Sequence, residues 1–343
     1  MEPLVDQYSR GALHGELGLG AFEAHLAVAA GGGPSPGPAG ATFFDSRLGL
    51  AVRRWCPPLL GLEPHCSAVR YLARRRELGA YAAGRALLRG SGIGTYLVGP
   101  DPQTGGELTT PAELASAGRA RAHEAVCLDQ LAAQVADTSG TVGSFLSNTA
   151  EALHAAARQT VTFVSGDGFL EAEAPALPEV LRAAGRWLRD RDRPPEPVVV
   201  RHLLWSALAT GRPVQVHCGD PAPLAAFLRT TQSLGATVVL LPRHPHHRRA
   251  AQLAAAFPHV YADVGPDPAR TLGEAPFGKL LFSSGARALP ELYVVAARRF
   301  VSALDRLLAA WVAEGQCART DADRVAAMVS AATARRVYRL GQS

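Results

Sequence analysis

Short apolar runs alternate with longer helical patterns along the chain, and this alternation restricts the fold more than any other feature. Each apolar run is bounded by turn residues, and several, such as VQVH and TVVLL, are almost continuously apolar. Runs of this kind are typical of parallel strands that are covered on both faces. They predict eight strands, at residues 3–6, 94–98, 125–129, 160–164, 213–217, 237–241, 260–264 and 279–283.

The stretches between these runs have helical spacing. Residues 221–234 begin with prolines and are followed by a glycine, residues 247–257 end before a proline, and residues 178–191 carry apolar side chains at helical intervals. Two long amphipathic stretches, 289–312 and 321–338, follow the last strand. The repeated alternation predicts a (β/α)8 barrel. A doubly wound open sheet is the alternative, although no GxGxxG follows the first strand.

The segment between the first two predicted strands is too long for a single barrel helix. Residues 31–40 read GGGPSPGPAG, which predicts a flexible surface loop, and residues 43–89 predict several helices. We therefore expect one barrel domain over residues 1–343. Within it, residues 31–92 form a loop and helical insertion that acts as a lid or as an oligomer contact.

The composition is that of a globular protein, with 48% hydrophobic and 19% charged residues. The net charge of +5 comes from arginines spread along the chain, and only 6% of residues are aromatic, so no nucleic-acid binding is expected. No apolar stretch approaches the roughly 20 residues that span a membrane. Five scattered cysteines without a CxxC motif predict reduced thiols. With no signal peptide at the N-terminus, these features predict a cytoplasmic protein, and the richness in Ala, Gly, Pro and Arg is typical of actinobacteria.

An ordered set of short motifs extends from residue 4 to residue 340. It comprises LVDQ, RRWCPPLLGL, PVQVHCGDP, FPHVYADVG, FGKLLFSS, PELY and ARRVYRL. On these motifs the chain resembles the amidohydrolase superfamily, in the amidohydrolase-related branch that includes the domain fused to glutamine-synthetase-like proteins. The resemblance implies a barrel whose C-terminal mouth binds one or two divalent metals. The ligands would be a first-strand His-x-His pair, a fourth-strand residue, a histidine from each of the fifth and sixth strands, and an eighth-strand aspartate.

Most of the ligand positions implied by this resemblance carry other residues. The fifth-strand histidine is present as His217, and the other positions fall on Tyr8, Arg10, Val164, Pro242 and Gly285. A hydrolytic zinc site needs about three protein ligands and an open position for water, which one imidazole does not supply. We therefore expect a degenerate centre that holds no metal and no other cofactor.

Arginines near the lost positions point to a small anionic ligand. Arg10 replaces a metal ligand, Arg243 follows the lost sixth-strand position, and Arg287 lies two residues beyond Gly285. Guanidinium groups bind carboxylate or phosphate bidentately and remain charged. We predict that Arg10, Arg243 and Arg287, with the neighbouring His244, bind the anion. The alternative is that Arg243 and Arg287 point outward on loops.

His217 is the first candidate for acid–base catalysis, because imidazole titrates near neutral pH. Tyr8, Asp220 and Asp263 are secondary catalytic candidates. Asp263 could equally be a structural acceptor at a strand end, and Tyr8 could fill the vacated cavity with its ring.

Two further sites remain open as alternatives. His244, His246 and His247, with His217 and Cys218, offer a relocated metal site, although no HExxH spacing is present. The turn at residues 166–168 could hold an anion on its backbone N–H groups, although a simple turn is the plainer interpretation. No G-x-S-x-G motif follows a strand, so a nucleophile elbow is not expected.

Three functions follow from these features. The first is a metal-independent hydrolase, lyase or cyclase of specialised metabolism that acts on a small anionic substrate. Pyrone-dicarboxylate lactonases resemble it in working without a metal, although they keep the eighth-strand aspartate. The second is a non-catalytic pseudoenzyme or scaffold that pairs with a glutamine-synthetase-like ligase. The third is a metal-dependent amide or C–N hydrolase with a relocated site. A homo-oligomer is a separate expectation, because barrels of this kind commonly pair through surface helices.

Overall fold

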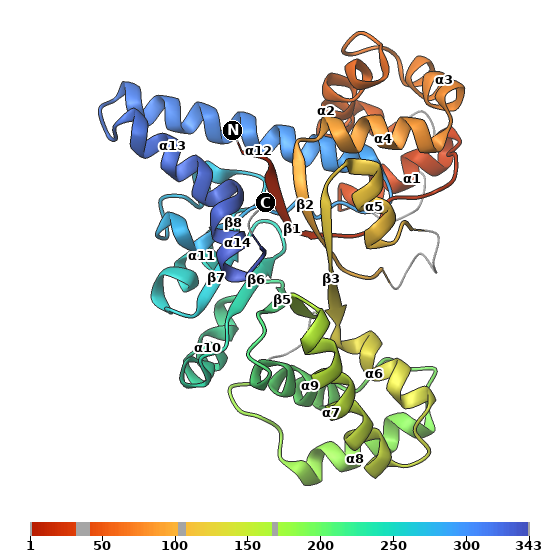
Figure 1. The fold of residues 1–343 in the computed structure, drawn as a ribbon, viewed down its shortest axis with the longest axis vertical. Helices are drawn as coiled ribbons and strands as arrows, with labels where there is room; N and C mark the ends of the chain where they lie inside the picture. Colours follow the sequence, from red (N-terminus) through yellow and green to blue (C-terminus); the bar gives the residue numbers. More distant parts are fainter. Residues whose placement is uncertain (1, 32–41, 102–107, 167–170, 342–343) are drawn as a thin grey trace. The chain divides into compact units, whose positions relative to one another are not determined.

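The described part of the chain has the alternation of strands and helices that the sequence predicts (Figure 1). The computed structural model describes residues 2–31, 42–101, 108–166 and 171–341. Eight strands follow one another in the sheet in chain order, as in a (β/α)8 barrel, with parallel pairing. They are β1 (Leu4–Ser9), β2 (Ile93–Val98), β3 (Arg121–Cys127), β4 (Thr162–Ser165), β5 (Val214–Cys218), β6 (Val238–Pro242), β7 (Val260–Asp263) and β8 (Leu280–Leu281). The predicted fold class is therefore confirmed.

Every predicted strand has a counterpart in the structure, and the predicted and observed strands differ only in where they begin and end. β1 continues to Ser9, whereas β8 contains only two residues. β3 ends at Cys127, so Asp129 belongs to the first turn of the following helix rather than to the strand.

The chain divides into two compact units. The first contains Met1–His123 and Phe282–Ala318. Its helices are α1 (Leu19–Ala29), α2 (Arg47–Trp55), α3 (Ala68–Leu78), α4 (Ala80–Gly90), α5 (Pro111–Gly118) and α12 (Pro290–Ala313). Helices α2 to α4 lie within residues 31–92, where the insertion after the first strand is predicted, whereas α1 precedes that range. Helices α2 and α4 pack against α12.

A buried ion pair joins α3 to α12. Glu291, in the first turn of α12, is fully buried; it lies 3.0 Å from Nε of Arg75 and accepts a 2.7 Å hydrogen bond from the Tyr71 hydroxyl. Most of the predicted loop at residues 31–40 lies outside the described residues.

The second unit contains Glu124–Leu281 and Arg319–Ser343. Its longer helices are α6 (Leu128–Asp137), α7 (Val142–Gln159), α8 (Leu177–Arg189), α9 (Pro197–Ala209), α10 (Ala225–Thr231), α11 (His247–Ala256), α13 (Arg319–Ala327) and α14 (Thr333–Val337). A π-helical turn, Met328–Ala332, joins the last two. The phenol of Tyr338, just past α14, accepts a 2.9 Å hydrogen bond from the buried amide of Gln215 on β5. This contact ties the end of the chain to the sheet.

None of the helices described is long and apolar enough to cross a membrane.

Candidate functional site

Asp6 on β1 organises the segment that follows β8 in the first unit. The side chain is fully buried and accepts hydrogen bonds from the backbone N–H of Ser284, at 2.7 Å, and from the Ser284 hydroxyl. The backbone N–H of Gly285 donates to the carbonyl of Tyr8 at 3.0 Å, and the N–H of Arg10 donates to the carbonyl of Ala286 at 2.8 Å. These bonds place residues 284–287 beside the C-terminal end of β1.

Two of the predicted anion-binding arginines meet on one buried carboxylate in this unit. Nη1 of Arg10 lies 3.3 Å from Asp101, and Nε of Arg287 lies 2.8 Å from the other carboxylate oxygen. The Asp101 side chain is 1% exposed, whereas those of Arg10 and Arg287 are 26% and 21% exposed. Asp101 follows β2 and is a residue that the sequence interpretation missed. The group carries two positive charges and one negative charge.

Tyr8 belongs to the same group. Its hydroxyl accepts a 3.1 Å hydrogen bond from Nε of Arg10, and the Arg10 guanidinium lies 5.9 Å from the centre of its ring. The ring also faces Gly99, where an added Cβ would lie 3.6 Å from it. Tyr8 therefore positions Arg10, and it is half-buried rather than sealed in the core.

Apart from Tyr8, the candidate catalytic residues lie in the second unit. His217 is the penultimate residue of β5, half-buried, and in register with Leu241 of β6. Asp263 ends β7; it is buried, accepts a 3.1 Å hydrogen bond from the N–H of Gly265, and lies 3.4 Å from Nε2 of His247. The pairing of His247 with Asp263 is not apparent in the sequence, where His247 reads only as the first residue of a helix.

Gly265 makes this pairing feasible. Its φ of +71° lies in the left-handed region, and an added Cβ would lie 2.4 Å from the imidazole of His247. The close approach of imidazole to backbone therefore requires glycine at this position.

The other predicted residues of the second unit lie on its surface. Asp220 is exposed; it accepts a 3.0 Å hydrogen bond from the N–H of Ala222 and lies 3.5 Å from Arg249. Arg243 and His244 are exposed in the turn before α11, and the backbone N–H of Arg243 donates to the carbonyl of Cys218 at 2.8 Å. Burial, with a further effect of Asp220, raises the pKa of Cys218 to about 12, so this thiol is unreactive at neutral pH.

Asp129 is a further titratable group that the sequence interpretation missed. Burial raises the pKa of its carboxyl, and its Oδ2 lies 2.8 Å from where a Cβ on Gly166 would stand. Ser165, the last residue of β4, is fully buried and finds no hydrogen-bond partner for its hydroxyl within the described residues. The signal in the sequence was an acidic residue two positions after a strand, in a helical first turn. The rest of the predicted 166–168 turn lies outside the described residues.

The donor set does not fit the metal centre that the resemblance implies. Across residues 2–31, 42–101, 108–166 and 171–341, no three His, Cys, Asp or Glu side chains are grouped so as to hold a metal ion. Where the first-strand ligands would stand, Arg10 brings a guanidinium that would repel a cation. Of the suggested histidine cluster, His247 contacts Asp263 and His246 lies 4.0 Å from Asp220.

Comparisons with known proteins support the fold. The chain is similar to a protein from Lactobacillus casei ATCC 334 assigned as a metal-dependent hydrolase, with a TM-score of 0.79 and 17% identity over 99% of this chain and 96% of the other. It is also similar to glucuronate isomerase from Caulobacter crescentus (TM-score 0.69, 14% identity, 100% and 92% covered) and to uronate isomerase from Thermotoga maritima (TM-score 0.65, 12% identity, 98% and 94% covered). At these identities the likeness establishes the architecture alone.

A sequence relative covers only part of the chain. Protein fluG of Emericella nidulans is 27% identical over 48% of this chain, and the match spans 22% of the fungal protein's length. No family model matches the sequence.

Proposed function

We propose that this chain is an amidohydrolase-like protein that has lost the metal centre and binds a small anionic molecule, on which it acts as a metal-independent hydrolase, lyase or cyclase. The observation that carries the proposal is the Arg10–Asp101–Arg287 group. Two guanidiniums stand where the resemblance implies a metal site, and a single carboxylate holds both. They supply a fixed positive charge without a metal ion.

The charge balance of this group favours an anion of low molecular weight. Asp101 offsets one of the two arginines, which leaves one net positive charge, and each arginine remains about a quarter exposed. Charge-assisted hydrogen bonds from arginine to carboxylate are strong and directional. A carboxylate is therefore the ligand group that we propose for this position.

Binding is tested by calorimetry on the whole chain with acetate, succinate and tricarballylate as probes. We expect saturable binding of at least one probe, and a loss of about tenfold or more in the variant Arg10→Gln/Arg287→Gln, because each charged hydrogen bond contributes about 1.5–3 kcal/mol. Arg182→Gln is the control, since Arg182 is exposed on α8. Unchanged affinity in the double variant would refute the binding proposal.

Catalysis is tested separately through His217, which we propose as the acid–base group. Metabolite mixtures are incubated with the wild-type chain and with His217→Asn, and substrate loss is followed by mass spectrometry. Turnover that disappears in His217→Asn while carboxylate binding persists supports an enzyme. Binding without turnover in the wild type supports the non-catalytic alternative.

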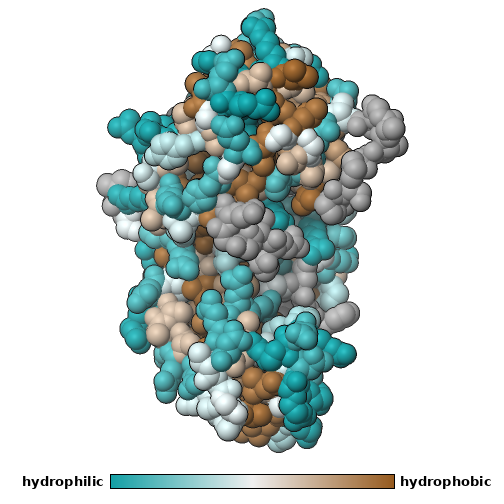
Figure 2. All heavy atoms as spheres, turned by 90° about the vertical axis from the view of Figure 1, so that its right-hand side faces the viewer, coloured by the Kyte–Doolittle hydropathy of each residue, from teal (hydrophilic) through white to brown (hydrophobic). Residues whose placement is uncertain are grey.

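A specific observation favours that second candidate, a pseudoenzyme that binds a protein partner. The helical insertion exposes large apolar side chains, including Val69 of α3 at 73% and Tyr81 of α4 at 67%. Figure 2 shows that apolar surface on one face of the molecule lies in several separate areas among hydrophilic ones. Sedimentation of the wild type and of Val69→Ser/Tyr81→Ser tests this candidate, because self-association through the insertion should weaken in the variant. A glutamine-synthetase-like ligase is the proposed alternative partner.

A further inference from the structure

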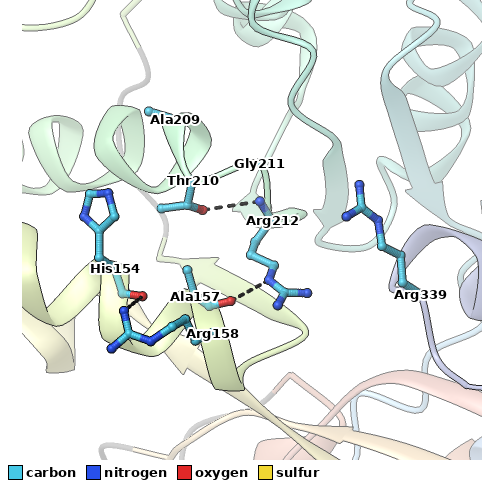
Figure 3. Close-up of a pocket in the computed structure, with 8 residues that line it drawn as sticks. All are labelled: His154, Ala157, Arg158, Ala209, Thr210, Gly211, Arg212 and Arg339. Atoms are coloured by element: carbon cyan, nitrogen blue, oxygen red, sulfur yellow. Dashed lines mark hydrogen bonds between the residues drawn. The ribbon is translucent and has the colours of Figure 1, made fainter.

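A basic hollow lies in the second unit, at the end of β5 opposite to His217 (Figure 3). Its volume is about 450 Å³. The lining includes His154 and Arg158 from α7, Thr210 and Arg212 from the α9–β5 connection, and Arg339 from the turn after α14. Among the residues that the structure describes, no acidic side chain contributes to the lining.

The contacts of Arg158 and Arg212 are partly explained by the C-terminal end of α7. Nε of Arg212 donates a 2.6 Å hydrogen bond to the carbonyl of Ala157, and Nη1 of Arg158 donates a 3.4 Å hydrogen bond to the carbonyl of His154. Cations near the last carbonyls of a helix are favourable because those carbonyls carry partial negative charge. These contacts hold Arg212 in place, and its guanidinium faces the hollow (Figure 3).

Helix capping does not explain Arg339. Within the described chain its guanidinium makes no hydrogen bond and no ion pair, and Figure 3 shows it directed toward the hollow from the side opposite Ala157. Its backbone has a φ of +53°, in the left-handed region. The N–H of Arg339 bonds to the carbonyl of Arg336, and the N–H of Leu340 bonds to that of Arg335. This is the helix-ending turn at which glycine is usual, because a Cβ is unfavourable there.

We propose that this hollow binds the phosphate groups of a small phosphorylated molecule. Three guanidiniums and one imidazole line it without a compensating carboxylate. Such a charge excess fits a multiply charged anion better than a monocarboxylate, and arginine matches phosphate oxygens bidentately. The volume lies within the range of small-molecule sites, about 300–1,000 Å³. The lining residues belong to the second unit, whereas Arg10 and Arg287 belong to the first, so the phosphate site and the proposed carboxylate site share no residue.

The test is calorimetric titration of the whole chain with inorganic pyrophosphate at constant ionic strength, with sulfate as the competing anion. We expect saturable binding of pyrophosphate that exceeds that of sulfate, and a loss of about tenfold or more in Arg212→Gln/Arg339→Gln. Arg10→Gln/Arg287→Gln should bind pyrophosphate as the wild type does, so this test is independent of the carboxylate site. Absence of saturable binding, or equal binding of sulfate, overturns the proposal.

A matched pair of glycine variants separates ligand binding from folding. Arg119, which follows α5 in the first unit, adopts the same left-handed helix-ending turn, with a φ of +52°. Arg339→Gly and Arg119→Gly should both leave the melting temperature unchanged or raised, because glycine relieves the same backbone conformation. Only Arg339→Gly should weaken pyrophosphate binding. Equal affinity in the two variants overturns the assignment of Arg339 to the site.

Discussion

Replacing Asp101 with asparagine tests whether one carboxylate holds the two arginines of the first unit. The amide keeps the shape of the side chain but removes the charge, and it leaves Arg10 and Arg287 as two like charges without the anion that they contact at 3.3 and 2.8 Å. Breaking a buried ion pair by removing one partner costs about 3–5 kcal/mol. Because the two guanidiniums are 26% and 21% exposed, water lessens that penalty, and we expect a loss of about 2–3 kcal/mol.

The measurement is the free energy of unfolding from urea titrations followed by circular dichroism. Urea is preferred to guanidinium chloride, since salt would screen the repulsion that the variant creates. Added sodium chloride should restore part of the lost stability in Asp101→Asn and affect the wild type less. The double variant Asp101→Asn/Arg287→Gln should be more stable than Asp101→Asn, because only one unbalanced guanidinium remains.

Two outcomes would refute this reasoning. A loss below about 0.5 kcal/mol in Asp101→Asn, the size of an ordinary surface substitution, would mean that water already neutralises the arginines. A double variant no more stable than Asp101→Asn would mean that the penalty comes from the lost hydrogen bonds and not from the like charges. In either case the fixed positive charge proposed for anion binding would lose its support.

Three further results are expected. Gly265→Ala should lower the free energy of unfolding by about 2–4 kcal/mol, because the backbone is left-handed there and the added Cβ would overlap His247. The control Gly219→Ala, whose Cβ would meet nothing within 4 Å, should have little effect. Equal effects of the two substitutions in urea titrations would contradict the close packing of His247 against Gly265. Asp129→Asn should be more stable than the wild type at neutral pH. Burial raises the pKa of the folded carboxyl, so the wild type loses stability as the pH rises through that pKa, and the gain from the substitution should vanish near pH 3. Melting experiments at both pH values check this, and the control Asp192→Asn, at an exposed position, should show no gain. Mass spectrometry of protein expressed with added zinc and manganese should find close to zero metal per chain, and about one tightly held metal would show that ligands were misassigned.

The positions of the strands were predictable because each is a nearly continuous apolar run, and that pattern belongs to the local sequence. The end of β3 was not, since Asp129 follows the last strand residue, Cys127, by only two positions and its acidic side chain suits either a strand end or a helix start. Arg10 and Arg287 could be selected because they lie at or near positions that the family resemblance marks. Their shared partner Asp101 could not, because it follows β2 by three residues in a turn without a distinctive pattern.

The basic hollow was even harder to predict from the sequence than Asp101. Its arginines come from α7, from the turn before β5 and from the end of the chain, so no window of the sequence contains them together. In the sequence they are indistinguishable from the many arginines on solvated helix faces. The left-handed conformation of Arg339 is also set by the turn that ends α14. An arginine in the sequence gives no sign of such a conformation.

Under the proposed function, anion binding by arginine and proton transfer by histidine should respond differently to pH. Arginine side chains stay protonated throughout the range in which proteins fold, whereas imidazole groups titrate near neutrality. Carboxylate affinity that rests on arginine should therefore be nearly constant between about pH 6 and 9, while turnover that needs an imidazole to exchange a proton should change with pH in that range. Calorimetry at several pH values, compared with initial rates under the same conditions, separates the two. Affinity that falls in step with the rate would mean that a titrating group, and not the paired arginines, holds the anion.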